Sequence, residues 1–227
     1  AGSAARKRPA RTVAFSLNLP IKQIEALTLD GSVELADAKL DHNAFDLHFT
    51  GANGVMRFNQ KGFLADRLDV GFRDRKATLS LAIGGYVADA HHALEASLAG
   101  VYPMSTVFAD VPALLPLLAK FPGESQWSAD VSVDQPQDGA ARSRLTLASD
   151  LRGTAIDLPA PLAKGPAATL PFQLDLELPY AGRMFTARLG DALSMHGRLP
   201  DATHAFGVRI DLGAAAAGEP PALGISV

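Results

Sequence analysis

The feature that most constrains this chain is an alternation of apolar and polar residues that returns in segment after segment. Phe15, Leu17 and Leu19 alternate with small or polar residues, and so do Leu79, Leu81 and Ile83. A period of two places the apolar residues on one face of a β-strand. The same period returns in segments 27–35, 45–50, 68–73, 94–98, 127–133, 145–147, 172–178, 184–189 and 208–212. We therefore predict about eleven to thirteen strands, each with one apolar side.

Turn-forming pairs stand between many of these segments. They are Gly84-Gly85, Asn53-Gly54, Asp138-Gly139 and Ala181-Gly182. Such pairs suit the positive backbone angles of tight turns, so we expect hairpins in series and an antiparallel sheet. We predict one more strand at residues 223–227, which we expect to lack a partner.

One interval has a helical period instead. Its apolar residues recur at spacings of three and four: Val107, Val111, Leu114, Leu115, Leu118 and Phe121. Asp110 suits a helix start, and Pro116 bends or shortens the helix beyond it. We predict a helical insert near residues 105–121, with the helix itself over roughly 111–121. Farther on, a Pro-rich stretch at residues 158–171 predicts an irregular crossing segment.

The 227 residues have the length of one large β-domain or of two small domains. Residues 1–11 begin with Ala-Gly-Ser, which we interpret as a cloning scar, and continue with four basic residues typical of a linker. We expect residues 12–227 to form a single elongated β-domain that is a fragment of a longer chain.

Composition excludes several classes of function. Hydrophobic residues make up 48% of the chain and charged residues 20%, which is too apolar for a disordered chain. The net charge of -3 argues against a nucleic-acid partner, and the absence of cysteine excludes disulfides and thiol chemistry. No stretch reaches the roughly 18 apolar residues of a membrane-spanning helix.

Catalytic and metal motifs are also missing from the sequence. His91 and His92 are adjacent, so in a strand they point to opposite faces and do not share one ion. No nucleophile elbow, zinc-protease motif or phosphate-binding loop occurs, and nothing selects one pair of carboxylates over another. We predict that the chain is not an enzyme and holds no cofactor or metal, with a carbohydrate-active enzyme that uses two carboxylates as the residual alternative. For Trp127, the only tryptophan, we expect a place between sheet and helix, with a sugar-stacking platform as the alternative.

The one-sided strands need a cover for their apolar faces. Strands about 4.8 Å apart make a sheet on the order of 55 Å across, whereas a helix of about eleven residues is about 16 Å long. The apolar side either meets itself in a closed β-sandwich or lines a curled, open sheet that accepts a ligand. Leaving several hundred Å² of it in water would cost roughly 10 kcal/mol. Both arrangements remain open on the pattern alone.

Two stretches of the sequence, residues 27–72 and 147–164, resemble a known family. The segments LTLDGSVELADA (residues 27–38), GVMRFNQKGFLA (54–65) and LDVGF (68–72) look like the repeating unit of AsmA-like envelope proteins. The segments LASDLRG (147–153) and DLPAPLAK (157–164) are similar to a stretch in the YhdP branch of that superfamily, as is the spacing of Gly123 and Trp127.

The resemblance implies an all-β fold, a long curled antiparallel sheet shaped as a groove or an open jelly-roll-like form. It also implies a periplasmic segment of an inner-membrane-anchored protein of Gram-negative bacteria, which moves phospholipids between membranes. The partners are then a phospholipid or other acyl-chain ligand, and membranes reached through parts of the chain not present here. A closed β-sandwich that acts as a scaffold or a glycan-binding module in envelope assembly is the alternative.

On this interpretation the hydrophobic face shields acyl chains. The candidate lining residues are the apolar members of the alternating segments: Phe15, Leu17, Leu29, Val33, Phe45, Leu47, Phe49, Phe58, Val70, Phe72, Leu79, Leu81, Leu147, Leu174, Leu176 and Ile210.

Overall fold

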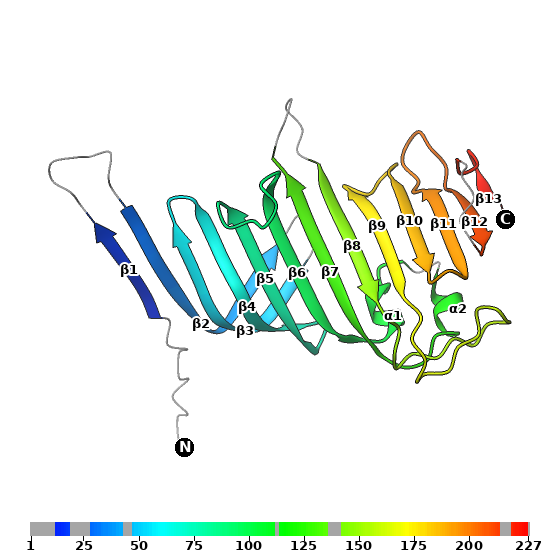
Figure 1. Ribbon diagram of the computed structural model, residues 1–227, viewed down its shortest axis with the longest axis horizontal. Coiled ribbons are helices and arrows are strands. Elements are labelled where there is room, and N and C mark those ends of the chain that lie inside the picture. The colour runs from blue at the N-terminus through cyan, green and yellow to red at the C-terminus, as the bar shows by residue number, and fades with distance from the viewer. Residues whose placement is uncertain are drawn as a thin grey trace, which may run out of the picture. The chain divides into compact units, whose positions relative to one another are not determined.

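The protein is described here by a computed structural model that covers residues 12–18, 28–42, 47–111, 114–135, 142–213 and 219–226, with only the backbone at 12–18 and 28–29. The chain divides into two compact units, residues 1–90 and 91–227. Each unit is built on β-strands that follow one another in chain order (Figure 1).

The first unit holds five antiparallel strands. They are β1 (Thr12–Asn18), β2 (Thr28–His42), β3 (Leu47–Asn59), β4 (Gly62–Phe72) and β5 (Arg75–Gly84). Two-residue connections join β3 to β4 and β4 to β5, and the second of these, Arg73-Asp74, has positive φ at both residues. Paired positive φ values match the twist of a tight antiparallel hairpin, so the register continues directly from strand to strand.

Three long strands of this unit carry β-bulges partway along their length. The pairing slips between Leu35 and Ala38 of β2, between Thr50 and Asn53 of β3, and between Ala65 and Leu68 of β4. Each slip inserts an extra residue that shifts the alternation by one. The apolar residues before and after each bulge therefore stay on the same face of the sheet.

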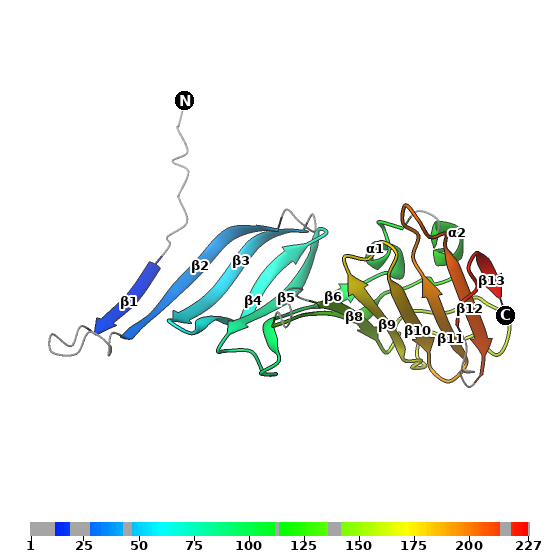
Figure 2. The same ribbon diagram turned by 90° about the horizontal axis from the view of Figure 1, so that it is seen from above.

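The bulges also bend the strands, as the curved course of β2 to β4 in Figures 1 and 2 shows. Small side chains line the bend: Ala38, Ala52 and Ala65 are all buried, Ala52 completely, and Leu68 beside them is 2% exposed. These residues are partners across the strands or next to such partners. The core of the first unit is thus the inside of the bend, where alanine allows neighbouring backbone to approach.

The predicted turn at Asn53-Gly54 is wrong. Both residues lie within β3, and Gly54 pairs with Leu68 of β4. Gly54 has φ +144 and meets backbone of β4, so glycine is needed here for close approach beside a bulge rather than for a chain reversal. The predicted turn at Asp138-Gly139 lies outside the described residues, whereas Ala181-Gly182 does connect two strands.

The second unit contains the remaining strands. They are β6 (His92–Tyr102), β7 (Ser125–Asp134), β8 (Ser143–Ser149), β9 (Phe172–Leu178), β10 (Met184–Leu189), β11 (Leu193–Arg198), β12 (Gly207–Leu212) and β13 (Gly224–Ser226). Neighbours from β6 to β12 are antiparallel. β13 pairs in parallel with β12 through Gly207 and Gly224, so the expectation that residues 223–227 lack a partner is wrong.

The helical insert lies between β6 and β7, as predicted, but it holds two short helices rather than one. α1 spans Met104–Val107 and α2 spans Leu115–Leu118. Pro103 precedes α1 and Pro116 occupies the first turn of α2, where a missing backbone N–H costs nothing. A proline farther into a helix would remove a hydrogen bond, so Pro116 begins a new helix instead of continuing an old one.

The structure confirms the predicted fold class. Thirteen strands and two short helices are described, and within each unit the strands form an open sheet rather than a closed barrel. The irregular crossing segment is present as well, between β8 and β9.

Candidate functional site

The register of the second unit places one continuous set of apolar side chains on a single face. Leu147 of β8, for example, lies between Ala129 of β7 and Leu174 of β9. We call this set the β6–β12 apolar face. Its members are Leu94, Ala96, Leu98, Trp127, Ala129, Val131, Val133, Leu145, Leu147, Phe172, Leu174, Leu176, Leu178, Phe185, Ala187, Leu189, Leu193, Met195, Val208 and Ile210.

Much of this face is only half-buried. Val131, Leu145 and Leu176 are direct cross-strand partners on β7, β8 and β9, and each keeps part of its surface exposed. No second sheet faces them among the described strands of this unit, which form one sheet in chain order. The arrangement therefore differs from a closed β-sandwich, whose facing sheets bury such residues completely.

One end of the same face is covered. There Trp127 is 4% exposed, and its ring centroid lies 6.1 Å from that of Phe108 and 5.5 Å from that of Phe172, with edge-on geometry in both pairs. Phe108 follows α1, so the insert supplies one of the three rings. Figures 1 and 2 both show α1 and α2 on one side of the strands at this end. Trp127 thus lies between sheet and helix, as predicted.

The crossing segment between β8 and β9 completes the cover. Leu151, Thr154 and Ile156 are buried there, and the Thr154 Oγ1 and Ser125 Oγ atoms are 2.6 Å apart. The end of the insert is tied to this segment, because the Ala155 N–H donates to the Pro122 carbonyl and the Asp157 N–H to the Lys120 carbonyl, both at 2.8 Å.

A lysine holds the crossing segment in shape. The Lys164 Nζ donates to the carbonyls of Leu151 at 2.8 Å, Thr154 at 2.6 Å, Ala168 at 2.9 Å and Gly165 at 3.2 Å. Burial lowers the pKa of the Lys164 ammonium, and the charge of Asp150 opposes that shift. The ammonium satisfies carbonyls that strand pairing leaves free in an irregular segment.

The first unit has an apolar face of its own. Two aromatic pairs belong to it: Phe49 and Phe72 have ring centroids 5.3 Å apart, and Phe58 and Phe63 have theirs 6.1 Å apart. Phe63 is 48% exposed. We call this set the β1–β5 apolar face; its members with described side chains are Val33, Leu35, Ala38, Leu40, Leu47, Phe49, Ala52, Met56, Phe58, Phe63, Ala65, Leu68, Val70, Phe72, Ala77, Leu79, Leu81 and Ile83.

The opposite faces of both units are largely polar. On the first unit, Arg57 and Asp66 form an exposed ion pair at 2.6 Å. On the second unit, the Thr146 hydroxyl and the Gln173 amide both donate to the Asp175 carboxylate at 2.7 Å. These bonds join neighbouring side chains on the surface of the sheet.

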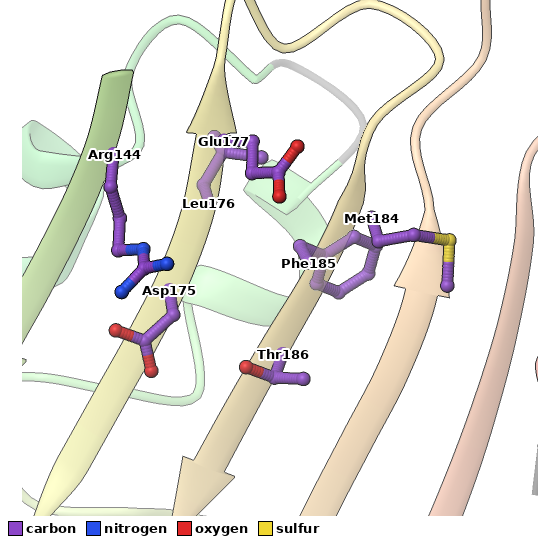
Figure 3. Close-up of a pocket in the computed structure, with 7 residues that line it drawn as sticks. All are labelled: Arg144, Asp175, Leu176, Glu177, Met184, Phe185 and Thr186. Atoms are coloured by element: carbon purple, nitrogen blue, oxygen red, sulfur yellow. The ribbon is translucent and has the colours of Figure 1, made fainter. Parts of the chain in front are cut away.

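A small hollow lies among the charged residues of the second unit. Figure 3 shows the Arg144 side chain from β8 beside Asp175 of β9, with Thr186 of β10 farther across. Leu176, Glu177, Met184 and Phe185 complete its lining. The Asp175 carboxylate beside the hollow accepts hydrogen bonds from Thr146 and Gln173, so the hollow is a feature of the polar face.

The predicted lining residues fall on these two faces. Val33, Leu47, Phe49, Phe58, Val70, Phe72, Leu79 and Leu81 belong to the β1–β5 apolar face. Leu147, Leu174, Leu176 and Ile210 belong to the β6–β12 apolar face. By the backbone register, Phe15, Leu17 and Leu29 occupy positions on the same face of the sheet as Val33. Phe45 lies outside the described residues.

Several members were missed from the sequence. Met56 and Phe63 fall outside the strands predicted at residues 45–50 and 68–73, because the bulges of β3 and β4 interrupt the alternation between these segments. Leu145, Phe185 and Met195 obey the period of two, so the alternation itself could have identified them.

A metal-binding cluster and a membrane-spanning helix are not found in the part of the chain that the structure describes. No three His, Cys, Asp or Glu side chains gather there as a metal site would require. Neither helix there has the length and apolar character needed to cross a bilayer.

The sequence matches the family of the YhdP protein over residues 10–227. Neither a curated protein nor a solved structure matches the chain. Since the family match covers almost the whole sequence, it agrees with the resemblance seen in residues 147–164. The chain belongs to the YhdP family.

Proposed function

We propose that this chain is a lipid-binding segment of a phospholipid-transport protein, and that its apolar sheet faces shield acyl chains from water. The observation that carries the proposal is the β6–β12 apolar face, which is continuous in register yet half-buried over much of its area. The β1–β5 apolar face has the same character.

The physical reason is the cost of leaving such a face in water. Each methylene group removed from water contributes about 0.8 kcal/mol, and an acyl chain lying on the sheet removes its own methylenes and the side chains beneath it together. Val131, Leu145 and Leu176 present adjacent apolar surface to such a ligand. Binding of this kind lowers the cost of extracting a lipid from a bilayer and needs no reacting group.

The polar faces suit contact with water. Ion pairs such as Arg57 with Asp66 and Arg183 with Glu177 lie on exposed surface, at 2.6 Å and 3.7 Å. A sheet with one apolar and one charged side keeps a lipid chain on one side only. The lipid head group then stays in water while the chain lies on the apolar face.

Membership of the YhdP family supports the cellular setting that we propose. In it, the chain belongs to the periplasmic part of an inner-membrane-anchored protein in the envelope of a Gram-negative bacterium. Anchoring and contact with membranes are functions of other parts of that protein.

The test is native mass spectrometry of the protein purified from bacteria without detergent. We expect adducts whose masses match phospholipids or fatty acids, and their loss after delipidation. A protein that carries no lipid and binds no apolar dye would contradict the proposal, and would favour a scaffold or glycan-binding module.

A further inference from the structure

The insert rests on the sheet through apolar contacts. Met104 and Leu118 are buried, and Phe108 meets Trp127 and Phe172 by ring edges. We call residues 104–111 and 114–121 the helical cover. The contacts that we describe between the helical cover and the β6–β12 apolar face are thus non-directional, and another apolar surface of similar size can replace them.

The backbone of the helical cover is satisfied locally. The N–H groups of Phe108, Val111 and Ala119 donate to the carbonyls of Met104, Phe108 and Leu115, all within the cover. The cover therefore keeps these bonds when it leaves the sheet. The backbone carbonyls of Lys120 and Pro122 accept hydrogen bonds from the crossing segment. These bonds hold the C-terminal end of the insert in place during such a movement.

The covered state also leaves one polar group unsatisfied. The indole Nε1 of Trp127 is buried, and no acceptor lies within hydrogen-bonding distance of it among the described residues. A buried donor without an acceptor loses its hydration and gains nothing in return. Uncovering Trp127 would let this N–H bond to water or to an ester oxygen of a lipid.

We propose that the helical cover is displaceable, and that it competes with an acyl chain for the end of the β6–β12 apolar face around Trp127. This inference rests on the proposed function. It means that the apolar face has a short form, with the cover seated, and a long form, in which lipid replaces Phe108 against Trp127 and Phe172. The apparent affinity of this end for lipid is then reduced by the fraction of time that the cover is seated.

The only tryptophan of the chain, Trp127, lies where the cover and the lipid compete, so its fluorescence reports directly whether lipid is bound there. The probe is a stearic acid with two bromine atoms at mid-chain, which quenches indole on near contact. We titrate the whole 227-residue chain with this acid and with unbrominated stearic acid as the blank. Saturable quenching of Trp127 by the brominated acid alone is the expected result.

Two neighbouring leucines of α2 give a matched pair of variants. Leu118 is 6% exposed and Leu117 is 47% exposed, so Leu118→Ala removes buried packing of the cover while Leu117→Ala shortens an exposed side chain. We expect Leu118→Ala to lower the half-quenching concentration by about tenfold and Leu117→Ala to leave it unchanged. Phe108→Leu is a milder second variant with a shift in the same direction, and circular dichroism verifies that each variant is folded.

A tryptophan on the uncovered part of the face separates this inference from the proposed function. In the double variant Trp127→Phe and Leu145→Trp, the new indole lies between Val131 and Leu176. Quenching there, with none at Trp127 in the wild type or in any folded cover variant, would overturn the displaceable cover and leave lipid binding in place. Equal shifts for Leu117→Ala and Leu118→Ala would also overturn it. No quenching at Trp127 and none at position 145 would reject both proposals.

Discussion

Asp37 and Asn53 join the bulges of two neighbouring strands. The backbone N–H of Asp37 donates to the Asn53 Oδ1 at 3.0 Å, and the Asn53 Nδ2 donates to the Gly51 carbonyl at 2.6 Å. Asp37 and Gly51 both have positive φ, at 51° and 59°. One amide side chain thus bonds to both irregular positions, and so keeps the bulges of β2 and β3 side by side.

Replacing Asn53 should therefore loosen the bend of the first unit. For Asn53→Ala we expect a loss of about 1 kcal/mol in the free energy of unfolding, because two hydrogen bonds to backbone are removed at an exposed site. Urea denaturation measures it. Val55→Ala, two residues along the same strand at an exposed position, should stay within about 0.5 kcal/mol of wild type. An equal effect of both changes would contradict the role of Asn53.

The hydrogen bonds that Lys164 donates should stabilise the covered end of the second unit. In Lys164→Met the carbonyl of Thr154, a fully buried residue, loses its described donor, and the carbonyl of Leu151 keeps only the Thr154 N–H at 3.2 Å. We expect a loss of about 1–3 kcal/mol in stability, measured by thermal or urea unfolding. Lys120→Met, at an exposed lysine of the insert, serves as the control and should be nearly neutral. Unchanged stability in Lys164→Met would show that water replaces the ammonium without cost.

The strands and their faces could be predicted from the sequence because the alternation survives wherever a strand is regular. Leu79 and Leu81 of β5 fall on the apolar face for that reason. The bulges could not be predicted, since at Asp66 and Arg67 two polar residues in succession look like an interruption between strands rather than a slip within one. The sequence therefore predicts only residues 68–73 of β4 as strand, whereas β4 begins at Gly62.

The covered end was predicted only in part. The period of the insert indicated helix, and the size of Trp127 indicated a place beneath it. The contribution of the crossing segment could not be predicted, because contacts such as Ser125 with Thr154 join residues 29 positions apart. A lysine that bonds to four carbonyls leaves no pattern in the sequence either.

Acid should weaken the connection between β11 and β12 through Asp201. Hydrogen bonds from the Thr203 and His204 backbone N–H groups and from their side chains hold the pKa of Asp201 far below its ordinary value of 3.8. A carboxylate with a lowered folded-state pKa contributes stability that is present above 3.8 and lost as the pH falls below it.

Urea denaturation of wild type and Asp201→Asn across this range tests that expectation. The asparagine keeps an acceptor oxygen but does not titrate. We expect wild type to be the more stable protein at about pH 6 and the difference to shrink toward about pH 2. A difference that stays constant with pH would show that Asp201 acts only as a hydrogen-bond acceptor.

Charge placed on the apolar face should abolish lipid binding, while the same charge on the polar face should not. Leu147 and Ala148 are adjacent, half-buried and on opposite sides of β8. We expect Leu147→Arg to remove co-purified lipid and Ala148→Arg to retain it, with both proteins folded by circular dichroism. Native mass spectrometry gives the lipid content. Retention of lipid by folded Leu147→Arg would place the binding surface elsewhere.

The most direct measurement is a photo-crosslinking scan along β8 in living bacteria. A benzophenone amino acid replaces Leu145, Thr146, Leu147 and Ala148 in turn, and cross-linked lipid is detected after ultraviolet exposure. The account predicts a period of two, with cross-links at 145 and 147, whose side chains belong to the β6–β12 apolar face, and none at 146 and 148. Equal cross-linking at all four positions, or cross-linking at 146 and 148 alone, would contradict the claim that this apolar face binds lipid.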